Sequence, residues 1–148
     1  MIARAGEQRM GAVGVWGTGP FENDDALDLT AELRADGVSV LRSALDEVVL
    51  LEPEGYLEAP SSSRAIAAAE VVAAARGRPA LDLPSEVTGW MNQAPRVDDS
   101  LLPLASKAIA RILDGSELKE LWHASEEGPA WESRITDLSE RLGLTDLR

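Results

Sequence analysis

The sequence predicts a single all-α domain, a single-domain helical bundle of about seven short helices with an irregular N-terminal arm. Gly and Pro divide the chain into short pieces, and most of these pieces carry apolar residues at helical spacing. A length of 148 residues with 45% hydrophobic content suits one domain with a real core. We therefore assign residues 11–148 to one helical domain and residues 1–10 to a disordered lead, with Met10 as an alternative start.

The first two expected helices cover residues 24–36 and 39–51. Asn23 is a good N-cap for the first, Asp24 and Asp25 suit the positive end of its dipole, and Gly37 suits its C-terminal end. The second helix ends in an apolar, partly β-branched run over residues 48–51. A short strand is the alternative there, and we favour a buried helix end.

The third expected helix begins within residues 60–63, with a serine as its cap, and runs to about Arg76. It is rich in Ala and apolar on every side except at Glu70, which predicts a central position. A short helix over residues 85–93 carries Trp90 and Met91. The next helix starts near residue 100, because Pro103 is tolerated only in a first turn.

Two more helices are expected near the C-terminus. Ser116 would cap the first, over residues 117–124. The second begins at Pro129, a typical first helical position, and ends at Gly143. Its apolar residues form one stripe, which predicts that a single side of this helix faces the core: Trp131, Ile135, Leu138 and Leu142.

Composition narrows the classes of partner. The formal net charge of −12 argues against nucleic acids and against anionic membrane surfaces. The chain contains no Cys, which excludes disulfides and thiolate chemistry, and no apolar run approaches the roughly 20 residues that span a bilayer. We therefore expect a soluble, cytoplasmic protein whose acidity keeps it in solution or attracts a basic partner.

The N-terminal arm is the most unusual segment. Two glycines, a proline, the only Phe and four acids fall within residues 16–28. This mixture is typical of a built turn that leads into a helix. We expect Trp16 and Phe21 to pack the arm on the bundle, with Gly17 and Gly19 forming the turn.

The same residues resemble a known family. Residues 10–12 and 16–28 look like the N-terminal signature of the bacterial family DUF4259, a domain of unknown function. Residues 56–59 and 67–73 resemble its second block, and residues 116–122 and 131–142 resemble its C-terminal block. The spacer over residues 13–15 departs from the family pattern and lengthens the arm. The resemblance implies a small helical protein and transfers no activity.

Acidic residues form the main candidate site. Glu22, Asp24, Asp25 and Asp28 surround the turn, and oxygen-rich groups of this kind suit a divalent cation such as Mg²⁺ or Ca²⁺. Glu58 and Glu70 would complete the cluster. The competing interpretation is structural: Asn23, Asp24 and Asp25 cap and complement a helix start, and Glu70 pairs with a cation or a backbone amide. The partners considered for Glu70 are Arg64, Arg76, Arg111 and the backbone amides of residues 17–21 other than Pro20.

Other chemical signals are weak. A Gly-x-Gly turn with neither a P-loop Lys nor a dinucleotide fingerprint does not support nucleotide binding. A di-metal bundle site needs the Glu-x-x-His motif twice, whereas His123 is the sole histidine, so we expect it to be a surface or helix-end residue. Trp90 and Met91 are the candidate interface residues, because Trp is enriched at binding hot spots.

The sequence therefore predicts a non-catalytic module that binds another protein, basic in character, as an accessory or immunity-type protein does. The alternative is an enzyme or sensor with a divalent metal bound by the carboxylates. A third interpretation is a bundle with a small apolar ligand pocket along the Ala-rich helix.

Overall fold

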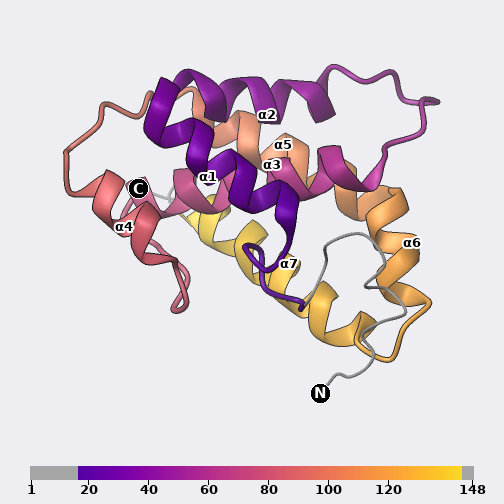
Figure 1. The fold of residues 1–148 in the computed structure, drawn as a ribbon. Helices are drawn as coiled ribbons and strands as arrows, with labels where there is room; N and C mark the ends of the chain where they lie inside the picture. The colour runs from indigo at the N-terminus through magenta and orange to yellow at the C-terminus, as the bar shows by residue number, and fades with distance from the viewer. Residues whose placement is uncertain (1–16, 145–148) are drawn as a thin grey trace.

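The computed structural model describes residues 17–144, and these form a bundle of seven helices without a strand (Figure 1). The lead, Trp16 and the spacer lie outside the described residues. The helices are α1 (Asp24–Asp36), α2 (Ser39–Val49), α3 (Ala59–Ala75), α4 (Ser85–Met91), α5 (Leu101–Asp114), α6 (Glu117–His123) and α7 (Gly128–Leu144). The prediction of an all-α domain is confirmed.

Local signals explain most helix ends. Asn23 caps α1, since its side chain accepts the Ala26 amide at 2.8 Å, and Ser116 caps α6 by accepting the Lys119 amide at 3.1 Å. Gly37 ends α1 with a φ of 84°, a conformation that glycine adopts without strain. These two caps and the end of α1 match the sequence prediction.

Several helix boundaries differ from the prediction. α3 begins at Ala59, directly after Glu58, and no serine caps it. The helix can start this early because Pro60 fits inside the first turn, where its missing N–H is not needed. α2 ends at Val49, two residues earlier than predicted. α7 begins at Gly128 and continues through Gly143 to Leu144, so Gly143 does not end it.

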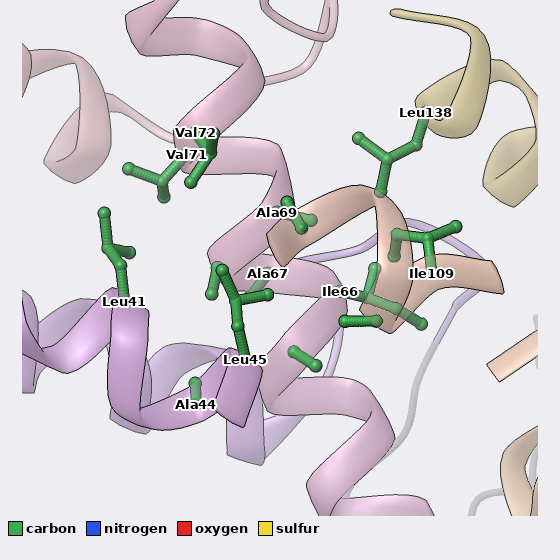
Figure 2. Close-up of a cluster of buried hydrophobic side chains, with 14 of the residues drawn as sticks. Leu41, Ala44, Leu45, Ile66, Ala67, Ala69, Val71, Val72, Ile109 and Leu138 are labelled. Carbon is green, nitrogen blue, oxygen red and sulfur yellow. The ribbon is translucent and has the colours of Figure 1, made fainter. Parts of the chain in front are cut away.

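α3 forms the centre of the bundle. It contacts α1, α2, α5, α6 and α7, and Figure 1 shows α2 and α7 on opposite sides of it. Small side chains make this possible, because a helix lined with Ala lets its neighbours approach closely. Figure 2 shows the resulting core around labelled residues of four helices: Leu41, Ala44 and Leu45 of α2; Ile66, Ala67, Ala69, Val71 and Val72 of α3; Ile109 of α5; and Leu138 of α7.

The described residues contain no helix that is both long enough and apolar enough to cross a membrane.

Candidate functional site

The glycine turn ahead of α1 is closed by its own glutamate. The Gly19 amide donates to Glu22 Oε1 at 2.9 Å, and the Glu22 amide donates to the Gly19 carbonyl at 3.1 Å. A Cβ atom on Gly17 or Gly19 would lie 2.2 or 2.8 Å from that carboxylate oxygen. Close approach of Glu22, rather than a left-handed backbone, is therefore what favours glycine here.

The turn packs against the bundle. Phe21 and Asn23 are buried, and a small cavity of about 20 Å³ separates residues 17–20 from side chains of α3, α6 and α7. Those side chains are Ser63, Ile66, Leu118, Trp122, Trp131 and Ile135. The expected docking of the arm is thus observed for residues 17–21, including Gly17, Gly19 and Phe21, whereas Trp16 lies outside the described residues.

Three aspartates follow on the first two turns of α1. Asp24 and Asp28 are exposed, and Asp25 is half-buried. Burial, together with the Asp28 and Asp24 carboxylates, raises the pKa of Asp25, although Arg64 of α3 opposes this shift. We call Asp24, Asp25 and Asp28 the acidic edge. In the described part of the chain, Asp24 and Asp28 have no ion pair with a basic side chain.

Arg64 is already engaged one turn further along α1. Its guanidinium donates to both carboxylate oxygens of Glu32, at 3.0 and 3.3 Å. Such a two-bond pair fixes a planar guanidinium against one carboxylate. Glu32, the next carboxylate along this side of α1, therefore has a paired arginine, whereas Asp24 and Asp28 have none among the described residues.

Glu58 and Glu70 do not join the acidic edge. Glu58 is exposed at the start of α3, whereas Glu70 lies mid-helix and is 3% exposed. Twelve residues of helix separate them by about 18 Å along the axis. Within residues 17–144, no three His, Cys, Asp or Glu side chains are grouped so that they could hold a metal ion.

Glu70 pairs with a residue that the sequence prediction did not consider. Arg141 of α7 donates to both carboxylate oxygens of Glu70, at 3.0 and 2.9 Å. Arg141 also donates to Asp137, at 2.8 Å, and to the Arg78 carbonyl, at 3.1 Å. Burial alone would lower the pKa of Arg141, but the hydrogen bonds and charges of Glu70 and Asp137 outweigh it and raise that pKa.

The expected partners of Glu70 are engaged elsewhere, which corrects that part of the prediction. Arg64 pairs with Glu32, Arg76 with Asp99, and Arg111 donates to the carbonyls of Gly55 and Gly115. Among the turn amides, the Gly19 amide donates to Glu22. The structural interpretation of Glu70 as an ion-paired side chain agrees with the structure, with Arg141 as the partner.

The prediction that Trp90 presents a binding surface is corrected as well. α4 packs against α1, and this packing buries Val87 and Trp90, one turn apart, with Trp90 only 7% exposed. Met91 is half-buried and packs against the core. The indole therefore fills space between helices instead of facing solvent.

His123 lies at an open groove between α6 and α7. The groove has a volume of about 770 Å³ and is lined mainly by polar residues of α7, from Glu132 to Glu140. His123 Nε2 lies 2.6 Å from Glu132 Oε1, and its ring meets Trp131 edge-on, with centroids 6.5 Å apart. The expected helix-end position of His123 is observed in the last turn of α6. Its partner is a carboxylate, so the pair links α6 to α7.

A comparison with models of known protein families shows to which family this chain belongs. The model of DUF4259, a domain of unknown function, matches residues 14–134, which is most of the chain. The chain belongs to the DUF4259 family. No curated protein and no solved structure matches it. The family description of DUF4259 names no activity, so function has to be argued from the residues of the site.

Proposed function

We propose that this DUF4259 protein is a non-catalytic accessory module that binds a basic surface of another protein through the acidic edge. It would act as an immunity-type protein does, by covering a positively charged region of its partner with carboxylates. The observation that carries the proposal is the contrast among its carboxylates. Glu32 and Glu70 each have an arginine, whereas Asp24 and Asp28 are exposed on a firmly capped helix and pair with no arginine in the part of the chain that the structure describes.

The charge of the whole chain supports this proposal. A formal net charge of −12 attracts cationic surfaces over long range and speeds their encounter. The raised pKa of Asp25 reflects burial and the repulsion among neighbouring carboxylates. A Lys or Arg brought by a partner would relieve that repulsion, so binding would be stronger than at an already neutralised surface.

The rigidity of the acidic edge also supports it. The Asn23 cap is buried, and the preceding turn is closed by Glu22 and packed on three helices. Carboxylates on such a base need little ordering when a partner docks, which reduces the entropic cost of association.

The test uses the double variant Asp24→Asn, Asp28→Asn, with Asp36→Asn as the matched control at the other end of α1. Partners are captured from a lysate of the source cells on immobilised protein, and the specific bands are quantified. We expect the double variant to lose a partner that the wild type and the Asp36 variant retain, and higher salt to weaken the wild-type complex. Equal capture by all three proteins would contradict the proposal.

A further inference from the structure

Tyr56 is an exposed aromatic side chain on a firmly held loop. It lies between α2 and α3, in the segment over residues 50–58, and is 59% exposed. The residues around it are anchored: Leu57 is buried, and Arg111 of α5 donates to the Gly55 carbonyl at 3.0 Å. An exposed aromatic side chain on an anchored loop is a candidate contact residue, because binding residues lie disproportionately on loops that a rigid scaffold positions.

α6 holds the other side of the loop. The Glu117 amide donates to the Leu57 carbonyl at 2.9 Å, and Glu117 Oε1 accepts the Ala59 amide at 2.8 Å. The Tyr56 hydroxyl donates to Glu120 at 3.3 Å, a long bond that leaves the ring face free. The loop is therefore ordered before any partner arrives.

Carboxylates surround the ring. Desolvation raises the pKa of Tyr56, and the negative charges of Glu117, Glu120 and Glu58 raise it further. The basic side chains of this region donate hydrogen bonds to backbone carbonyls. Arg111 donates to two carbonyls, and Lys119 donates to the Leu113 carbonyl at 2.7 Å. In the described residues, Glu58 and Glu120 form no ion pair that would cancel their charge.

We propose that Tyr56, Glu58 and Glu120 form a docking surface, the Tyr56 surface, for a protein segment in which apolar side chains alternate with Lys or Arg. The face of the Tyr56 ring would pack on the apolar side chains, and the two carboxylates would pair with the cations. Tyr is enriched among residues that dominate binding energy, and its few rotatable bonds make it inexpensive to order. Charge complementarity selects a basic partner. This inference rests on the proposed function, to which it adds a second contact surface.

The chain offers a direct signal for this site, since Tyr56 is its only tyrosine. The full-length protein is titrated with a short synthetic peptide of alternating arginine and leucine, and tyrosinate absorbance is followed against pH. Cations that pair with Glu58 and Glu120 cancel two of the negative charges that raise the pKa of Tyr56, and the phenolic oxygen stays at the edge of the contact, so we expect the bound peptide to lower that pKa. An unchanged Tyr56 titration at saturating peptide would overturn the inference.

Variants test the same point by affinity. Tyr56→Ser should weaken peptide binding about tenfold, the loss typical of a modest hot spot. Leu81→Ser serves as the matched control, because Leu81 is fully exposed in the loop between α3 and α4. The affinity of this variant for the peptide should equal that of the wild type. Equal affinity of the Tyr56 variant and the wild type would overturn the inference. Both variants replace exposed side chains, so both should fold, and circular dichroism spectra of the two variants would check this.

The two proposals fail in different ways. If Asp24→Asn, Asp28→Asn loses the cellular partner while Tyr56→Ser retains it, the acidic edge stands and the Tyr56 surface is wrong. If Tyr56→Ser also loses the partner, the Tyr56 surface is supported. If neither set of changes affects capture, both proposals are wrong.

Discussion

Among the described residues, Glu70 is the one charged side chain that is buried, and its environment has consequences for stability. The carboxylate is 3% exposed, and the paired Arg141 side chain is 14% exposed. Taking both charges out of water is costly, and their mutual attraction offsets that cost only while both remain. The pair therefore fixes how α7 lies on α3 more than it adds stability.

We predict that Glu70→Gln lowers the free energy of unfolding by about 2–4 kcal/mol, because Arg141 is left buried with a weaker partner. The double variant Glu70→Leu, Arg141→Met should lose much less, since no unpaired charge remains. Urea unfolding of Glu70→Leu, of Arg141→Met and of the double variant gives the coupling energy of the pair. A single Glu70→Gln variant as stable as the wild type would show that Asp137 and the Arg78 carbonyl satisfy Arg141 by themselves.

The hydrogen bonding of Asp98 indicates that the stability of the fold depends on pH. The Ser100 amide donates to its carboxylate at 3.1 Å, and this bond, aided by the Ser100 side chain and by Arg42, lowers the pKa of Asp98 below 3.8. A lowered folded-state pKa means that the ionised form stabilises the fold. This stabilisation is present above the unfolded pKa of 3.8 and is lost as the pH falls through the folded value.

The expected result is that Asp98→Ala unfolds at a lower temperature than the wild type at pH 7, with a difference that shrinks as the pH falls below 3.8. Parallel melting curves over the whole pH range would rule out this role for Asp98.

At the scale of elements, a side chain of α6 caps the N-terminal end of α3, which is distant in the sequence. α3 has no side-chain cap of its own, and Glu117 supplies the acceptor for the Ala59 amide from 58 residues away. A helix start leaves its first amides without internal partners, so an outside carboxylate takes the place of a local cap. The same residue ties the Tyr56 loop to α6 through the Leu57 carbonyl.

Glu117→Ala should therefore lower the free energy of unfolding by about 1 kcal/mol, the usual value of a lost N-cap. Glu117→Gln keeps an acceptor oxygen and should lose less than half of that. Chemical denaturation of both variants measures the difference. Equal losses would mean that the charge of Glu117 matters and its hydrogen bond does not.

The sequence could predict elements whose signals are local. Asn23, Gly37 and Ser116 act within a few residues, so the bounds of α1 and the start of α6 follow from them. Glu70 could be recognised as buried and paired, because it interrupts an apolar helix. Its partner Arg141 is 71 residues away, and the burial of Trp90 depends on how α4 packs against α1. Both require the tertiary arrangement, as does the anchoring of Tyr56.

For the whole molecule, charge is the dominant property. The 148 residues carry a formal net charge of −12, and the negative side chains repel one another most strongly when the chain is compact. The exposed ion pairs, such as Arg134 with Asp82, contribute little in return, because solvent screens them.

We predict that raising NaCl from about 0.01 to 0.15 M, which shortens the Debye length from about 30 to 8 Å, stabilises the protein by up to about 1 kcal/mol. Asp24→Asn, Asp28→Asn should respond less, since two of the repelling charges are gone. Thermal melts at several salt concentrations provide the measurement. A melting temperature that falls with salt would mean that the ion pairs outweigh the repulsion.

The central position of α3 has a practical consequence. Other helices cover it on several sides, so its amides in the stretch over residues 65–74 should exchange with deuterium only when the whole molecule opens. A ligand that binds the folded state slows such opening by mass action wherever it docks. The protection of these amides would therefore report any genuine partner, on whichever face of the bundle it sits.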